Sequence, residues 1–296
     1  MPALLSNSRR AASAPRATPW GRQGRSPLLP QTQLLDTPPH TLDLALRAEI
    51  EHEIILWDAY PDNPAGVVRL ADVSCSIAEK AYLLLSPAHR RFVALYTACL
   101  THIDDNGSSA AVSAAQHFSR RFARGERQML PALETLARLL REDVYELFPS
   151  VGADAIVSNS IDAVTSMYLE YSTGRMAITP GATRWPDYFR AKTGICAAYT
   201  YLMYPKGFRD SPETYLQMVP YMDHWIGAVN DILSFYKEEL AHETNNYVSE
   251  TLTDGALLDA TFASDAELDA VWQHFKQGYM EFHVETKRYR LAEVGV

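Results

Sequence analysis

Four polar residues stand at helical spacing in the C-terminal part of the chain, namely Asn230, Ser234, Lys237 and Glu238. Residues 230–238 contain neither glycine nor proline, so we expect them to be helical. At 3.6 residues per turn, the side chains of Asn230, Ser234 and Glu238 fall within about 80° on one face. An amide oxygen, a hydroxyl and a carboxylate suit Mg²⁺, which also takes waters and substrate phosphates as ligands. The pattern indicates a metal site for a phosphate-bearing substrate, with Lys237 placed to meet the phosphate.

The alternative interpretation of this stretch is the polar face of an amphipathic helix. Upstream, Met222 and Ile226 place apolar side chains on the same stripe. Solvent exposure therefore accounts poorly for Asn230 and Ser234.

Two adjacent carboxylates, Asp104 and Asp105, end an apolar segment that we expect to be a helix. Its start is marked by Ser86 as N-cap and Pro87 at the first helical position. Acidic side chains are poorly placed at a helix C-terminus, which is the negative end of its dipole, and a bound cation would remove this conflict. The alternative is a polar turn in which Gly107 adopts the left-handed conformation.

The nine residues 230–238 resemble the N-D-x-x-S-x-x-x-E metal motif of class I terpene cyclases, and in particular that of the trichodiene synthase family of fungal sesquiterpene cyclases. In this resemblance, Asp104 and Asp105 correspond to the aspartate-rich motif that faces the first motif across a cavity. The family pattern has a further acid where this chain has Ser108. The metal ligands implied by the resemblance are Asp104, Asp105, Asn230, Ser234 and Glu238.

Two further segments resemble the diphosphate-binding parts of the same family. Residues 188–194 resemble a region in which an arginine, here Arg190, senses diphosphate before a helix break near Thr193-Gly194. The alternative is an exposed arginine, or one paired with an acid such as Asp187. Arg288-Tyr289 resembles an Arg-Tyr pair near the family's C-terminus, and the alternative there is a basic helix end favoured by the dipole. The implied diphosphate-binding residues are Arg190, Lys237, Arg288 and Tyr289, and the implied catalytic residues are Asp104, Arg190, Asn230 and Glu238.

The resemblance implies an all-α, single-domain helical bundle around a central cavity, formed by residues 36–296. It also implies a Mg²⁺-dependent sesquiterpene cyclase that ionises farnesyl diphosphate to a cyclic C15 product and diphosphate, with three Mg²⁺ ions bound together with the substrate. A homodimer is compatible with the family. Candidate cavity walls, each of which could equally be ordinary core, are Phe92, Tyr96, Phe189, Met222 and Trp225.

Two other functions stay open. A chain-elongating prenyltransferase is also helical and uses Mg²⁺, but it would normally carry two full aspartate-rich motifs. A degenerate, non-catalytic cyclase fold acting as a binding protein is favoured by Ser108 and by a segment between Glu238 and Arg288 that is shorter than in the family.

The elements that must position these residues are helices. Apolar periodicity and helix-boundary signals predict helices over 41–57, 67–85, 87–103, 110–124, 129–146 and 153–171, one from Asp187, one from Ser211 through Glu238, and one that starts at a capping box over 264–267 and runs to Leu291. Residues 172–186 hold two glycines and two prolines, and we expect a loop there.

Composition narrows the function classes. The chain of 296 residues is 47% hydrophobic, enough for one large core, and its net charge of −9 argues against a nucleic-acid surface. No apolar run approaches the roughly 18 residues of a membrane span. Three widely spaced cysteines suggest neither a disulfide framework nor a zinc site, and no Rossmann, P-loop, H-E-x-x-H or G-x-S-x-G motif is present.

The first 35 residues differ from the rest of the chain. They contain five arginines, five prolines and no acid. We expect a disordered tail and a cytoplasmic protein. The alternative is an organelle transit peptide, since such peptides are rich in arginine and poor in acids.

Overall fold

The chain folds into a helical bundle, seen here in a computed structural model. The structure describes residues 42–173, 176, 181–182, 184–193, 195–208, 212–240 and 258–294, with the side chains of Pro186, Asp187, residues 235–240 and Val294 excepted. The predicted tail over residues 1–35 lies outside these ranges. Every regular element in these ranges is helical, as the all-α prediction requires.

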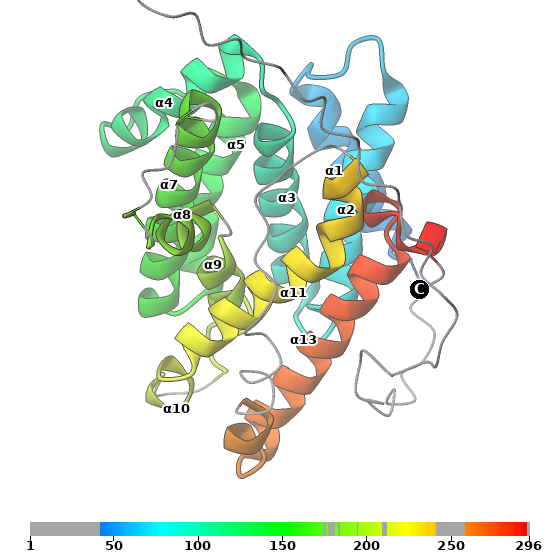
Figure 1. The fold of residues 1–296 in the computed structure, drawn as a ribbon, viewed down its shortest axis with the longest axis vertical. Helices are drawn as coiled ribbons and strands as arrows, with labels where there is room; N and C mark the ends of the chain where they lie inside the picture. The colour runs from blue at the N-terminus through cyan, green and yellow to red at the C-terminus, as the bar shows by residue number, and fades with distance from the viewer. Residues whose placement is uncertain are drawn as a thin grey trace, which may run out of the picture. The chain divides into compact units, whose positions relative to one another are not determined.

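The first half of the bundle is built around α3 (Pro87–Asp104), which lies between two groups of helices (Figure 1). On one side are α1 (Leu44–Leu56) and α2 (Pro64–Lys80). On the other are α4 (Ser109–Ala123), α5 (Pro131–Arg138), the π-helical turn η1 (Leu139–Asp143), α6 (Val144–Leu147) and α7 (Ser150–Thr173). Eleven of the eighteen residues of α3 are buried, because the middle of this helix is mostly apolar and is covered by its neighbours.

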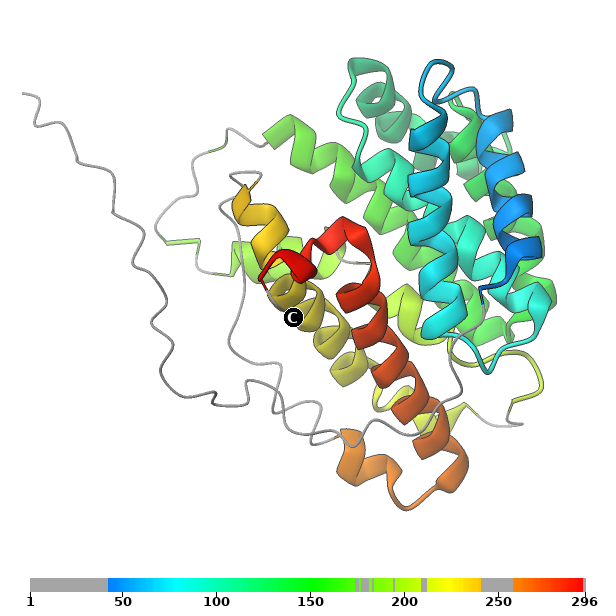
Figure 2. The ribbon, with the colours of Figure 1, turned by 90° about the vertical axis from the view of Figure 1, so that its right-hand side faces the viewer.

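The second half of the chain closes the bundle. It contains α8 (Trp185–Thr193), α9 (Cys196–Tyr201), α10 (Glu213–Leu216), α11 (Val219–Leu240) and α13 (Ala266–Glu285), followed by the short 3₁₀ turns η2 (Lys287–Tyr289) and η3 (Leu291–Val294). Figure 2 shows α11 and α13 running alongside each other. The described residues include no helix with the length and hydropathy needed to cross a lipid bilayer.

Three predicted boundaries were wrong. The helix predicted to begin at Ser211 is instead two helices, α10 and α11, because Pro220 has no N–H to continue the first one. The N-cap of α13 is Asp265, whose carboxylate accepts from the backbone N–H groups of Glu267 and Leu268, rather than Ser264. The same helix ends at Glu285, and the chain continues to Leu291 in 3₁₀ turns.

The other predicted helices needed smaller corrections. The helix predicted over 67–85 ends at Lys80. The one predicted over 129–146 is interrupted by the π-helical turn η1. Ser86 has the extended backbone of an N-cap, but its hydroxyl interacts with His89 Nδ1 at 2.7 Å instead of capping α3.

Two helices approach each other very closely where Gly278 on α13 meets the end of α2. A Cβ at Gly278 would overlap the carbonyl of Lys80 and lie 2.7 Å from the backbone N of Ala81. Because these atoms are backbone, they cannot move aside independently, and the side chain must be absent. We expect Gly278→Ala to lower the free energy of unfolding by about 2–3 kcal/mol.

Urea unfolding of the two proteins checks this prediction, with Gly152→Ala as the matched control. Gly152 is also a buried helical glycine, but the nearest atom to a Cβ placed there would be 3.7 Å away. Alanine is the better helix former, so the control is expected to change stability by less than about 1 kcal/mol. Equal effects at both positions would contradict the steric argument.

Candidate active site

The two predicted metal-binding acids lie at the end of α3, with half-exposed side chains. Asp104 is 51% exposed and Asp105 is 49% exposed. The Tyr171 hydroxyl on α7 donates to the backbone carbonyl of Asp104, and its ring fills the space next to Gly107. The described glycines with positive φ are Gly125 and Gly207, so the left-handed turn considered for Gly107 is not formed. Instead, α7 holds this turn in place.

Arg288 binds these acids directly. Its guanidinium donates to both carboxylate oxygens of Asp105, at 2.7 and 2.8 Å, and lies 4.0 Å from Asp104. Burial by itself would lower the pKa of Arg288, but the hydrogen bonds and negative charge of Asp105 raise it above its ordinary value. The predicted diphosphate-binding cation therefore lies beside the predicted metal-binding acids.

Tyr289, the next residue, contacts the other predicted motif. Its side chain is buried and interacts with Asn230 on α11. Burial raises the pKa of Tyr289 to about 12, while the charge of Arg288 and the interaction with Asn230 act in the opposite direction. Consecutive residues on η2 thus connect the end of α3 to α11, two motifs that lie far apart in the sequence.

Asn230 and Ser234 share the inner side of α11. Asn230 is half-buried, Ser234 is 1% exposed, and the amide nitrogen of Asn230 lies 3.1 Å from His283 Nε2 on α13. A solvent-facing polar stripe does not account for a buried Ser234. Lys237 and Glu238 belong to α11 by their backbone, but their side chains lie outside the described part of the chain.

The residues present can be tested against the Mg²⁺ that the sequence predicts. No group of three His, Cys, Asp or Glu side chains with metal-site geometry occurs in the described ranges. The predicted site, however, draws on the amide of Asn230, the hydroxyl of Ser234 and the side chain of Glu238. Together with two accessible carboxylates at the end of α3, these oxygen donors are the kind that Mg²⁺ takes. The donor set therefore fits the ion.

Arg190 on α8 is held against α11 by a partner that the sequence did not reveal. Its guanidinium donates to both carboxylate oxygens of Asp231, at 2.9 and 2.5 Å, and to the backbone carbonyl of Gly227 at 3.0 Å. Asp187, the partner considered from sequence, has a side chain outside the described part of the chain. Burial would lower the pKa of Arg190, but Cys196 and Asp231 raise it above its ordinary value.

One signal in the sequence could have identified the α11 side of this pair. Gly227 and Asp231 are four residues apart, so they share one face of α11, where a missing side chain leaves room for a partner. Asp231 is only 12% exposed at its side chain, and a buried carboxylate requires a cation. The neighbouring Arg190 supplies it.

The helix break predicted after Arg190 is confirmed. It lies about one residue later than the predicted position at Thr193-Gly194. Helix α8 ends at Thr193, and α9 begins at Cys196. Between them Ile195 has φ of 54°, an uncommon left-handed conformation for a β-branched residue. Gly194 itself lies outside the described residues. The break places a turn of irregular backbone directly after the Arg190 helix.

Ser108, where the family pattern has an acid, has a structural role. Its hydroxyl accepts from the backbone N–H of Ala111 and caps α4. We expect Ser108→Ala to lower stability by about 1 kcal/mol through loss of this cap. Ser108→Asp should retain the cap, since aspartate is an equally good N-cap. Thermal unfolding of the two variants checks this, and equal destabilisation by both would contradict it.

The candidate wall residues pack against other side chains. Phe92 stacks on Tyr96 at 5.9 Å between ring centroids, and Trp225 meets Trp272 at 5.1 Å. Phe92, Tyr96, Met222 and Trp225 are all buried. Phe189 is half-buried and stacks on Trp185 at 5.3 Å. Phe92, Tyr96, Met222 and Trp225 belong to the packed core of this structure.

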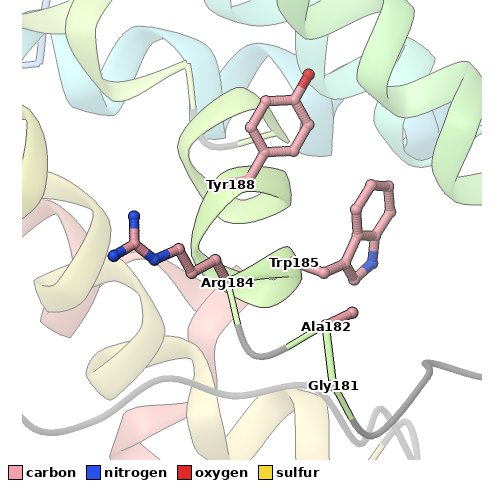
Figure 3. Close-up of a pocket in the computed structure, with 5 residues that line it drawn as sticks. All are labelled: Gly181, Ala182, Arg184, Trp185 and Tyr188. Atoms are coloured by element: carbon pink, nitrogen blue, oxygen red, sulfur yellow. The ribbon is translucent and has the colours of Figure 1, made fainter.

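An open hollow of about 600 Å³ lies at the start of α8, lined by Gly181, Ala182, Arg184, Trp185 and Tyr188 (Figure 3). In Figure 3, Arg184 points away from the ring of Trp185. None of these lining residues is a predicted ligand of metal or diphosphate. The chemistry-bearing contacts are those of α3, α8, α11 and η2, so we place the candidate active site there.

Known proteins that are similar to this chain are terpene synthases. Residues 82–295 match the family described as Trichodiene synthase (TRI5). Among curated proteins, the chain is 28% identical to alpha-cuprenene synthase COP6 of Coprinopsis cinerea, over 85% of this chain and 88% of that protein. It is 32% identical to terpene synthase BipA of Cochliobolus sativus, over 75% of each chain.

A solved structure shows the same fold. The crystal structure of linalool/nerolidol synthase from Streptomyces clavuligerus matches with a TM-score of 0.57 at 12% identity, over 81% of this chain and 94% of that one. The family match spans more than half of the chain, and its two named relatives are terpene synthases. The chain therefore belongs to the trichodiene synthase family of terpene synthases, which are lyases that act on prenyl diphosphates.

Proposed function

We propose that this protein is a Mg²⁺-dependent sesquiterpene cyclase that converts farnesyl diphosphate into a cyclic C15 product and diphosphate, with residues 36–296 as the catalytic domain. The observation that carries the proposal is the link made by η2. Arg288 binds Asp105, and the buried Tyr289 interacts with Asn230. A cation, a phenol and oxygen donors from two distant motifs are thereby gathered at one place.

The reaction begins when the C–O bond of the substrate breaks, so that negative charge grows on diphosphate while an allylic cation forms. Groups that are already positive around the leaving group lower this barrier. Asp104, Asp105, Asn230, Ser234 and Glu238 would hold Mg²⁺. When bound, Mg²⁺ supplies Lewis-acid stabilisation of the diphosphate.

The chain's own residues complete the site. Arg288 is a planar donor suited to binding phosphate oxygens in pairs, and Tyr289 offers a hydroxyl next to it. Arg190 and Lys237 are the further cations in our proposal. The allylic cation must then be kept from water, and aromatic rings do this while their faces stabilise passing positive charge. Among the residues expected to form that surface, Phe189 remains our candidate, because Phe92, Tyr96, Met222 and Trp225 are packed in the core.

The test is to incubate the purified chain with Mg²⁺ and, separately, geranyl, farnesyl and geranylgeranyl diphosphate, and to measure volatile products and released diphosphate. We expect cyclic C15 hydrocarbon from farnesyl diphosphate, abolished by EDTA. Longer prenyl diphosphates formed on adding isopentenyl diphosphate would show a prenyltransferase instead. A well-folded sample without turnover of any substrate would indicate the non-catalytic fold.

A further inference from the structure

We propose that His283 is a positioning residue that fixes the rotation of the Asn230 side-chain amide, so that its oxygen is the atom presented to a divalent cation. The inference rests on the proposed function, because it assigns Asn230 to the metal site. It concerns a residue that the motif does not contain. Residues 230 and 283 meet because α11 and α13 run alongside each other (Figure 2).

The surroundings of His283 hold its ring in one place. Its side chain is fully buried on α13. Three aromatic rings surround it, with ring centroids at 4.5 Å for Tyr279, 4.9 Å for Phe282 and 4.3 Å for Tyr289. A fully buried imidazole inside an aromatic shell has little freedom to turn, so its nitrogen atoms have fixed directions.

The hydrogen bonds then determine which nitrogen of His283 carries the proton. Nδ1 lies 2.8 Å from the backbone carbonyl oxygen of Tyr279. A carbonyl can only accept, so Nδ1 is the donor. The atom that faces Nε2 is the side-chain amide nitrogen of Asn230, which can only donate, so Nε2 is the acceptor.

The same reasoning fixes the amide of Asn230. Its NH₂ end lies 3.1 Å from Nε2 of His283 and donates to it, which leaves the oxygen at the other end of the group. With the nitrogen directed to His283 on α13, the oxygen is turned away from that ring. If the amide were rotated by 180°, its oxygen would face the lone pair of Nε2, and the two acceptors would repel each other.

The expected effect of His283 is therefore on metal affinity. Residues that hydrogen-bond to a metal ligand and so orient it typically contribute about 10- to 100-fold to metal affinity. His283→Leu removes the acceptor and keeps the site apolar, so we expect Mg²⁺ to bind about 10-fold more weakly. His283→Gln can place an amide oxygen near the position of Nε2, and it should restore most of this affinity.

The experiment is a calorimetric titration of Mg²⁺ into the full-length protein in the presence of inorganic diphosphate, which involves no turnover. Leu268→Ala is the matched control, because Leu268 is buried near the start of the same helix, about four turns from His283. It should lower the melting temperature and leave Mg²⁺ affinity within about twofold of the wild type, a difference of about 0.4 kcal/mol.

A double variant tests whether His283 acts through Asn230. If it does, adding His283→Leu to Asn230→Ala causes no further loss of Mg²⁺ affinity, since the amide to be oriented is already gone. Losses that multiply in the double variant, or a His283→Leu protein that binds Mg²⁺ as the wild type does, would overturn the inference. A wild-type protein that binds no Mg²⁺ with diphosphate would overturn the proposed function and this inference with it.

Discussion

Replacing Arg190 with methionine is expected to lower kcat/KM by about 10³-fold and to destabilise the protein at the same time. The loss of rate follows if Arg190 stabilises the departing diphosphate, because a single charge-stabilising donor in an active site typically contributes about 10²- to 10³-fold. The loss of stability follows because Arg190 pairs with the buried Asp231 in this structure. Asp231 is only 12% exposed and accepts from Arg190 at two oxygens. Left unpaired, it should cost about 3 kcal/mol.

A second substitution separates the two effects. Arg190→Met/Asp231→Leu removes both charges and should recover much of the stability, since a buried ion pair can be replaced by apolar side chains at little cost. It should not recover the rate, because the diphosphate would still lack its cation. The measurements are kcat/KM with farnesyl diphosphate and the urea midpoint of each variant.

The matched control for Arg190 lies two residues further along α8. Lys192 pairs with Asp162 at 2.6 Å, and the Asp162 carboxylate is 59% exposed, so it can be hydrated when the pair is broken. Lys192→Met is expected to change stability by less than about 1 kcal/mol and to leave kcat/KM unchanged. If the double variant at Arg190 and Asp231 regained full activity together with stability, Arg190 would be a structural residue and its diphosphate role would be wrong.

The pairing of Arg190 also bears on how substrate binding begins. In this structure the guanidinium is already neutralised by Asp231 and is bound to the Gly227 carbonyl. A diphosphate that recruits Arg190 must share this cation with α11 or displace it. In either case, substrate binding would act on Asp231, which is adjacent to Asn230, and so on the helix that carries the proposed metal ligands.

Much of the helical architecture could be predicted from local signals. Pro87 begins α3 as its position after Ser86 indicates, and the apolar residues of α1, α3 and α7 mark helices with a buried face. The predicted helix boundaries were wrong where a single residue interrupts a periodic apolar pattern. Pro220 divides a segment whose apolar spacing is continuous, because a missing N–H is invisible to hydrophobic periodicity.

The candidate site was less predictable, for a different reason. Single-helix spacing placed Asn230 and Ser234 on one buried side of α11, as the structure shows. It gave no means of choosing partners from other helices. Asp231 lies within the motif, yet its pairing with Arg190 depends on how α8 packs against α11, and the contact of Asn230 with His283 depends on α13. These are tertiary contacts across 41 and 53 residues of sequence.

The second large effect is expected at Arg288. Arg288→Ala should lower kcat/KM by about 10²-fold through loss of a cation at the diphosphate, with a stability change below about 1 kcal/mol. The stability effect is small because Asp105, unlike Asp231, is 49% exposed and can be hydrated when its partner is lost. Calorimetry with inorganic diphosphate and Mg²⁺ should show weaker binding, measured beside kcat/KM.

Two further variants test whether the effect is specific to Arg288. Lys287→Ala removes the neighbouring exposed cation and should leave both measurements nearly unchanged, which would exclude a general charge effect. Arg288→Lys keeps the charge but loses the planar pair of donors now bound to Asp105, so only part of the activity should return. Equal losses for Arg288→Ala and Lys287→Ala would mean that overall charge, rather than the contact between η2 and the end of α3, attracts the diphosphate.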